Sequence, residues 1–341
     1  MNFFGLDIGS HSLKVAQVEK SGDSYQLVAL GIASSPGDGV VSESPGSLTA
    51  LSEAIKKLCA EAKIDTNNVV VALPEDKVFT RVMEMPSMKD EELDSAIGWE
   101  AEQYIPLPME EVSLDYQVVS RPEKGKDQKM EVLLVAAPKR LIEKYLLVLE
   151  NAGLRPVSLE TEIIAIARSV APPDSFPIMV VDLGARATDI AIVNQGQIVF
   201  TRSIGTAGEA LTRAVATELK LDPAQAEEYK KAYGVDPQQL EGKVKGAIGP
   251  ILDAVVKEMG KAIEYYQSKH TENPVKRAVL TGGTAGLPEM VSLLAQKLGI
   301  EVQLADPFAR LKKEGEILAK LPEGVAPLYA AAVGLALKEV G

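Results

Sequence analysis

Cysteine and histidine are scarce in this sequence of 341 residues. With a single cysteine, Cys59, the chain cannot form an internal disulfide, and a reducing compartment is the simpler expectation. Cys59 lies in the apolar helical pattern KKLCAEA, which is typical of a small core residue. The two histidines, His11 and His270, are too few for a histidine metal cluster. The sequence therefore excludes a disulfide scaffold and disfavours a histidine-based metal centre.

Basic residues are outnumbered, with 36 Lys and Arg against 48 Asp and Glu, which gives a net charge of −12. This balance disfavours nucleic acid as a partner and loose docking on anionic lipid. No apolar run approaches the roughly 20 residues that cross a bilayer, and the N-terminal MNFFGLDIGS lacks the features of a signal peptide. Walker A and GxGxxG motifs are also missing. We expect no nucleic-acid partner and no direct membrane insertion.

One pattern occurs twice, as FFGLDIGSHSLK from residue 3 and as IMVVDLGARATDIAIV from residue 178. Aligning Asp7 with Asp182 also aligns Gly9 with Gly184. Each copy predicts a β-hairpin with an acidic residue before a glycine turn. Glycine lets backbone amides approach a bound anion closely. Two facing turns would grip a polyphosphate, and Asp7 and Asp182 could hold Mg2+ through its water shell.

A single copy would be an ordinary hairpin, because short motifs often match by chance. Two copies, each opening one half of the chain, indicate a duplicated α/β domain. The paired pattern resembles the superfamily of actin, heat-shock chaperones and sugar kinases. That resemblance implies an actin-like fold, with duplicated RNase H-like halves around a nucleotide cleft, and ATP with Mg2+ as cofactors.

The resemblance implies specific phosphate contacts from both turns. Lys14 takes the place of the phosphate-contacting lysine, although a solvated strand lysine is the alternative. Hydroxyl groups and backbone amides of the turns are suited to donate hydrogen bonds to phosphate. The expected contacts are Asp7, Gly9, Ser10, Ser12 and Lys14 in the first turn, and Asp182, Gly184, Ala185 and Thr188 in the second.

Three later segments resemble the superfamily's nucleoside-binding parts. Gly205 and Gly208 lie in SIGTAGEALT, before the first helix of the second half. Glu227 and Lys230 lie in AEEYKKAYG, which is similar to an FtsA segment near the ribose and adenine. Gly282, Gly283 and Thr284 belong to LTGGTAGL, which resembles the adenosine loop. Their order along the chain matches the superfamily.

Glu160 is the candidate catalytic residue, because its place between a predicted strand and a predicted helix resembles that of the glutamine that orients water in actin. A carboxylate just before a helix is equally well explained as a helix cap. The sequence leaves both interpretations open.

Residues 86–158 interrupt the first half with strands and helices of their own, an insertion that resembles FtsA. Within it, ELDSAIGWEAEQYIPLPMEEVSLDYQVV (residues 92–119) is similar to the PilM family of type IV pilus assembly proteins. The resemblance implies a cytoplasmic, ATP-binding scaffold at the inner membrane, bound to the N-terminal cytoplasmic tail of the membrane protein PilN. The candidate contacts for this tail are Trp99, Tyr104, Ile105 and Leu107. Alternatively, both aromatic rings belong to the core of the insert.

We expect four structural parts and one closing helix. The first subdomain comprises 1–85 and 159–174, the insert 86–158, the second subdomain 175–210 and 275–341, and a helical subdomain 211–274. A final helix at 325–339 is expected to pack on the first half. The family also implies contacts with other inner-membrane platform proteins and assembly ATPases, and self-association. A small-molecule kinase and an FtsA-like filament protein are the alternative functions.

Overall fold

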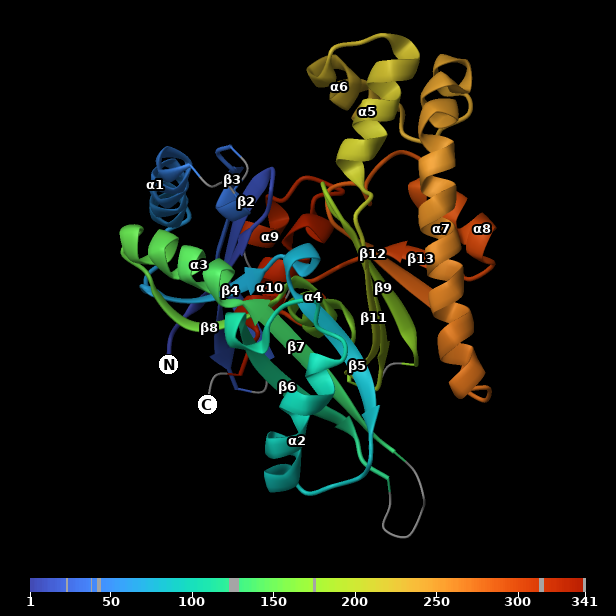
Figure 1. Ribbon diagram of the computed structural model, residues 1–341. Helices are drawn as coiled ribbons and strands as arrows, with labels where there is room; N and C mark the ends of the chain where they lie inside the picture. The colour runs from blue at the N-terminus through green and yellow to red at the C-terminus, as the bar shows by residue number, and fades with distance from the viewer. Residues whose placement is uncertain are drawn as a thin grey trace.

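The structure is a computed structural model that describes residues 1–22, 24–37, 39–41, 44–122, 129–173, 176–312 and 316–339. Within these residues, two five-stranded sheets have the orders β3-β2-β1-β4-β8 and β11-β10-β9-β12-β13, and a three-stranded sheet has the order β5-β7-β6. In each large sheet an antiparallel meander continues into parallel strands. The expected duplicated α/β fold is confirmed (Figure 1).

The first half begins with a hairpin meander and closes with helices on its sheet. Apolar residues at both faces of the central strands explain why β1 and β4 are buried. The bounds are β1 Phe4–Ile8, β2 Ser12–Ser21, β3 Ser24–Ser34, α1 Pro45–Glu61, β4 Asn68–Leu73, α3 Lys139–Asn151, β8 Arg155–Thr161 and α4 Glu162–Val170.

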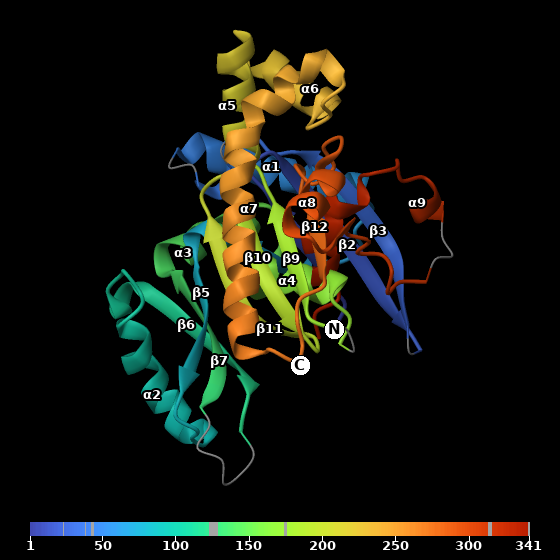
Figure 2. The ribbon, with the colours of Figure 1, turned by 90° about the vertical axis from the view of Figure 1, so that its right-hand side faces the viewer.

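The second half repeats this plan and adds a helical lobe, visible at the top of Figure 1, and a long helix beside its sheet (Figure 2). The bounds are β9 Ile178–Leu183, β10 Thr188–Asn194, β11 Gln197–Ile204, α5 Gly208–Leu219, α6 Pro223–Tyr233, α7 Lys243–Lys269, β12 Arg277–Thr281, α8 Met290–Leu298, β13 Glu301–Leu304, α9 Glu316–Ala319 and α10 Ala330–Ala336.

The long helix α7 begins at Lys243 and does not extend back to Pro237. Leu240 and Glu241 adopt left-handed backbone angles, with φ of 45° and 54°, and these break the helix before Lys243. Pro250 lies inside α7 without ending it.

The insert is a three-stranded sheet covered by one helix: β5 Phe79–Met85, α2 Asp90–Glu102, β6 Val112–Ser120 and β7 Met130–Pro138. Its sheet starts earlier than the expected residue 86, because β5 pairs with β7 from Phe79 onward. It also ends earlier than 158. Helix α3 buries Tyr145 in the first-half core, and β8 pairs with β4. The expected boundary at 174/175 lies outside the described residues.

The closing segment differs in length from the expected helix. A 3-10 turn at Ala326–Tyr329 leads into the short α10. This helix lies against α4 and β1 of the first half. Contact is so close that a Cβ at Gly334 would overlap the carbonyl oxygen of Ala165. A glycine is therefore required where α10 crosses α4.

The insert contacts the second half through β11, the edge strand of the second five-stranded sheet. Strand β11 lies against β5, and the hydroxyl of Thr201 donates to the carbonyl of Thr80 at 2.8 Å. Lys269 on α7 forms an ion pair with Glu84 on β5. The insert is thus attached to the second half through both β11 and α7.

Candidate functional site

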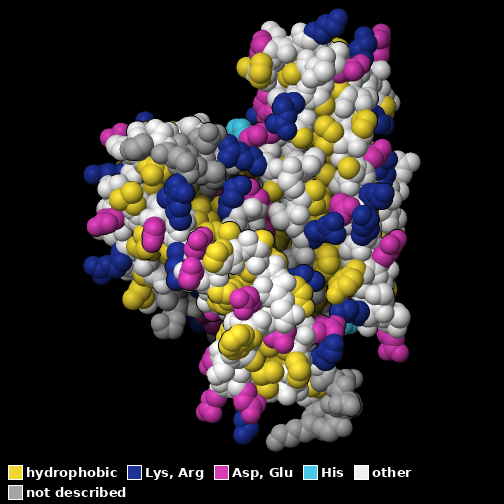
Figure 3. Space-filling view, in the orientation of Figure 1, with side chains coloured by type: hydrophobic (Ala, Val, Ile, Leu, Met, Phe, Trp, Pro, Cys, Tyr) yellow, Lys and Arg dark blue, Asp and Glu magenta, His cyan; other side chains and the backbone are white. Residues whose placement is uncertain are grey.

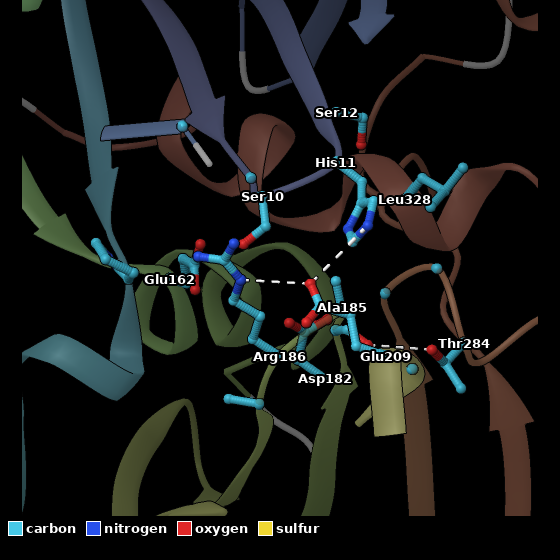
Figure 4. A pocket seen from close by; sticks show the side chains of 18 of the residues that line it. Ser10, His11, Ser12, Glu162, Asp182, Ala185, Arg186, Glu209, Thr284 and Leu328 are labelled. Carbon is cyan, nitrogen blue, oxygen red and sulfur yellow. Dashed lines mark hydrogen bonds and ion pairs between the residues drawn. The ribbon is translucent and has the colours of Figure 1, made fainter. Parts of the chain in front are cut away.

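A cleft of about 710 Å³ lies between the two halves (Figure 4). It is lined by both hairpin turns, by residues of α4, α5 and α6, and by the loop after β12. Each half therefore contributes one turn to opposite walls of the same cavity.

Asp7 and Lys14 line the cleft on the side of the first half. The antiparallel register places them opposite each other on β1 and β2, and the Lys14 ammonium donates to Asp7 Oδ2 at 2.9 Å. Burial by itself would lower the pKa of Lys14, but the Asp7 carboxylate outweighs it, so the pKa is raised. Lys14 therefore stays charged in the cleft.

The two turns are closed by the same backbone bond. Gly9 N–H donates to the Ser12 carbonyl at 3.1 Å, and Gly184 N–H donates to the Ala187 carbonyl at 3.1 Å. A Cβ on Gly9 would lie 2.9 Å from the Ser12 oxygen, and one on Gly184 would lie 3.0 Å from that of Ala187. Glycine is needed at both positions because the backbone folds back on itself.

Hydrogen bonds join the second hairpin to β12 and its turn to the start of α5. Asp182 Oδ1 accepts from the hydroxyl of Thr281 at 2.6 Å. Burial raises the pKa of Asp182, and this hydrogen bond opposes the shift. The start of α5 is hydrogen-bonded to the turn, with Gly208 N–H donating to the Gly184 carbonyl at 3.1 Å. These bonds fix the turn relative to β12 and α5.

Glu160 is not in the cleft, and the expected position for it is wrong. Its carboxylate accepts two bonds from the Arg168 guanidinium, at 2.6 and 2.8 Å, and one from Lys338 at 2.7 Å. The residue that faces the cleft is Glu162. Glu160 still belongs to β8, whereas α4 begins at Glu162 and directs this first side chain toward the turns.

Two further carboxyl groups, those of Glu162 and Asp189, line the cleft. Burial raises the pKa of Glu162 well above its usual range, and the charges of Asp7 and Asp182 raise it further. Asp189 on β10 also lines the cleft, and burial raises its pKa in the same way. The sequence reasoning missed both residues, although DLGARATD contains Asp189 directly after Thr188.

The opposite end of the cleft is built from α6 and the loop after β12. Lys230 Nζ donates to the Gly208 carbonyl at 3.1 Å and to the hydroxyl of Thr212 at 2.9 Å, and it pairs with Glu227 at 2.6 Å. Partial burial would raise the pKa of Glu227, but the bonds from Lys230 and Thr212 lower it to about 2. Thr284 donates to the Gly184 carbonyl at 3.1 Å.

Most of the predicted phosphate and nucleoside contacts meet in this cleft. They are Asp7, Gly9, Ser10, Ser12, Lys14, Asp182, Gly184, Ala185, Gly208, Glu227, Lys230, Gly282, Gly283 and Thr284. Two others do not. The hydroxyl of Thr188 is buried and donates to the Thr206 carbonyl at 2.8 Å, so it holds the hairpin instead. Gly205 is exposed and lies outside the cleft lining.

An ionic cluster across the cleft was missed as well. Glu209, in the first turn of α5, contacts Arg186 Nε at 3.3 Å and His11 Nε2 at 3.9 Å. Arg186 comes from the second turn and His11 from the first. Figure 4 shows the Arg186 side chain extending into the cleft toward Ser10 and Glu162. The sequence contains no signal for this contact, which depends on how the halves face each other.

The insert carries a separate exposed apolar surface, and Figure 3 shows hydrophobic side chains gathered over this part of the molecule. Trp99, Tyr104 and Leu107 are 77%, 41% and 40% exposed. Ile105 is buried in the insert core, so its expected role as a surface contact is wrong. The exposure of Trp99 likewise rules out the alternative that both rings are core residues.

Within the described part of the chain, no group of three or more His, Cys, Asp or Glu side chains is arranged to hold a metal ion directly. The same part of the chain contains no helix that is long and apolar enough to cross a membrane.

Duplicated sheets, two glycine turns on opposite walls of one cleft, and an insert in the first half define an actin-like fold. The model of the family "Type IV pilus assembly protein PilM" matches residues 5–340. The chain belongs to this PilM family.

Individual relatives agree with this assignment. A solved PilM-PilN type IV pilus biogenesis complex contains a chain with 30% sequence identity and a TM-score of 0.83, with 99% of this chain and 98% of that one covered. Cell division protein FtsA of Streptococcus pneumoniae is 24% identical over 344 residues, with coverage of 89% of this chain and 75% of FtsA. MreB5 of Spiroplasma citri, solved with AMPPNP, shares the fold alone, at 13% identity, a TM-score of 0.53 and coverage of 97% and 94%.

Proposed function

We propose that the chain is an ATP-binding scaffold of type IV pilus assembly that holds the cytoplasmic tail of a PilN-like membrane protein. The observation that carries the nucleotide part is the matched pair of turns. Each is closed by the same Gly N–H bond, and the two lie on opposite walls of one cleft. Backbone amides presented from two sides suit a polyphosphate.

In this proposal the phosphates lie between the turns and the nucleoside lies toward α6. Lys14 supplies the fixed positive charge for the terminal phosphates, because its pKa is raised and its ammonium lines the cleft. At the nucleoside end, Glu227 would accept and Lys230 would donate hydrogen bonds. Gly282 and Gly283 would let the backbone lie close to the base.

The same site suits Mg2+. Asp7 and Asp182 offer carboxylate oxygens from opposite walls, and hard oxygen ligands are what this ion prefers. Two carboxylates are too few for an all-protein cage, so they would hold the ion through water and the nucleotide's phosphates. A bound Mg2+ neutralises charge on the β- and γ-phosphates.

We expect slow turnover or none in the isolated protein. Glu162 lines the cleft in place of Glu160, but burial and the charges of Asp7 and Asp182 raise its pKa. A raised pKa disfavours the ionised form of Glu162, which is the form that could accept a proton from water. The cleft is therefore better suited to hold ATP than to hydrolyse it, which favours a scaffold over a small-molecule kinase.

The proposed binding of a PilN-like tail is based on exposed residues of the insert. Trp99, Tyr104 and Leu107 are exposed apolar side chains on α2 and the segment after it, and large aromatic side chains are frequent binding anchors. The similar solved chain forms a complex with PilN. Such a partner would recruit the protein to the cytoplasmic face of the inner membrane. Contacts with other platform proteins, assembly ATPases or a second copy stay predictions.

The test is calorimetric titration of ATP into the full chain with and without Mg2+. Micromolar binding that needs Mg2+ is the expected result. Asp182→Ala should weaken binding at least tenfold while the melting temperature stays near that of wild type. Absence of binding at millimolar ATP, or unchanged affinity in the folded variant, would remove the two-turn model. Phosphate transfer to a sugar panel would instead support a kinase.

A further inference from the structure

His11 and Arg186 are equivalent residues of the two turns. The alignment that pairs Asp7 with Asp182 and Gly9 with Gly184 also pairs His11 with Arg186. Their side chains come from opposite walls of the cleft. Both contact one carboxylate, that of Glu209, at 3.9 and 3.3 Å. The duplicated turns thus present two basic side chains to a single anion.

Glu209 is positioned to act as that anion. Its backbone N–H donates to the Ala185 carbonyl at 2.8 Å, which fixes the start of α5 against the second turn. Its carboxylate also lies 3.9 Å from Arg213, one helical turn further along α5. The carboxylate therefore occupies the space between the turns from a rigid backbone position.

The guanidinium of Arg186 points away from its own backbone and into the cleft. Figure 4 shows it directed toward Ser10 of the first turn and Glu162 of α4. This region belongs to the cleft that both glycine turns and Lys14 line, where the proposed function puts the terminal phosphates. A guanidinium matches phosphate oxygens in two parallel hydrogen bonds, which a lysine cannot do.

We propose that Arg186 is the residue that distinguishes a nucleoside triphosphate from a diphosphate, and that Glu209 holds its guanidinium until a terminal phosphate replaces the carboxylate. This inference rests on the proposed nucleotide site. Lys14 and the backbone amides also serve the β-phosphate, which ADP retains, whereas Arg186 is placed at the γ-phosphate, which only ATP has. Exchange of a half-exposed carboxylate for a phosphate keeps the guanidinium paired in both states, so binding does not leave a buried charge alone.

The proposal predicts opposite effects for neighbouring substitutions. Arg186→Ala should weaken ATP binding about tenfold to hundredfold, the usual effect of losing hydrogen bonds to a charged group, and ADP binding less than threefold. Arg186→Lys should restore part of the ATP affinity. Glu209→Gln should raise the ratio of ATP to ADP affinity, because the competing carboxylate is gone.

The experiment is titration of ATP and of ADP, with Mg2+, into the full-length wild type and each variant. Arg277→Ala is the matched control, because Arg277 begins the same strand that ends in the cleft but pairs with Glu301 at its far end. That control should keep the wild-type ratio. Melting temperatures establish that each variant is folded.

The outcomes separate the two proposals. If the wild type binds no nucleotide, the proposed function fails and this inference fails with it. If the wild type binds ATP and Arg186→Ala lowers ATP and ADP affinity equally, or changes neither, only the inference is overturned. If Arg186→Ala does not fold, Glu209→Gln decides, because an unchanged or lowered ratio contradicts a carboxylate that competes with the terminal phosphate.

Discussion

Lys14 and Asp7 face each other across the first hairpin as an almost fully buried ion pair, with 2.9 Å between the ammonium and the carboxylate. Removing one member of a buried pair leaves the other charge unpaired, which typically costs about 3–5 kcal/mol. Lys14→Met should therefore lower the free energy of unfolding by about that amount in urea denaturation, and abolish ATP binding.

The double variant Asp7→Asn with Lys14→Met separates the two effects. It removes both charges, so most of the lost stability should return, while ATP binding stays absent. A double variant that recovers ATP binding would contradict the assignment of Lys14 to the phosphates.

Glu75 provides a pH test. It is buried beside Glu162, and burial raises its pKa above the ordinary 4.5. As the pH rises above 4.5, the unfolded chain ionises while the folded state resists ionisation, so the free energy of unfolding falls until the folded pKa is passed. Glu75→Gln removes this loss and should raise the melting temperature at pH 7–8 by a few degrees, with little change below pH 4.

Glu53→Gln, on the exposed face of α1, is the control and should show no pH-dependent gain. Lower stability of Glu75→Gln at pH 8 would mean that the ionised carboxylate is itself stabilising.

Two glycines in helices should respond in opposite ways to alanine. Gly334→Ala places a methyl group on the backbone of Ala165, so α10 must move off α4, and a loss of about 1–3 kcal/mol or more is expected. Gly246→Ala, in α7, meets nothing within 4 Å and should gain about 0.5–1 kcal/mol. Chemical denaturation of both variants measures the difference. Equal effects would contradict the close crossing of α10 and α4.

Trp99 tests the partner surface. Because the ring is mostly exposed, Trp99→Ala should leave the melting temperature and ATP affinity unchanged. Loss of an anchoring aromatic, worth about 2 kcal/mol or more, should weaken capture of a peptide copying the PilN tail by about thirtyfold or more. Phe176→Ala removes an equally exposed ring outside the insert and is the matched control.

A charge reversal gives an independent test of the same surface. Glu100→Lys with Glu102→Lys, next to Trp99, should abolish peptide capture in a folded protein. Full binding by this variant would move the search for the partner site to the first half.

The hairpins and their glycine turns could be predicted from sequence because strand alternation and turn residues are local signals. The choice of Glu160 over Glu162 could not be corrected locally. It depends on where β8 gives way to α4, and helix boundaries are the least certain part of such predictions. Thr188 was misplaced because its hydroxyl finds the Thr206 carbonyl, a contact between β10 and the loop after β11. The Arg186–Glu209–His11 cluster required the packing of both halves.

The contact between β11 and β5 connects the proposed nucleotide cleft with the insert that carries the proposed partner site. The hairpin whose turn contains Gly184 continues into β11, and β11 is hydrogen-bonded to the insert through Thr201 and Thr80. A tilt of this hairpin must therefore carry the insert with it or break that bond. If the hairpin and the insert move together, binding at the insert and binding in the cleft are coupled. Linkage then requires each binding event to change the free energy of the other by the same amount. A tail bound at Trp99 would then change the affinity of the cleft for its nucleotide by the same factor as the nucleotide changes the affinity for the tail.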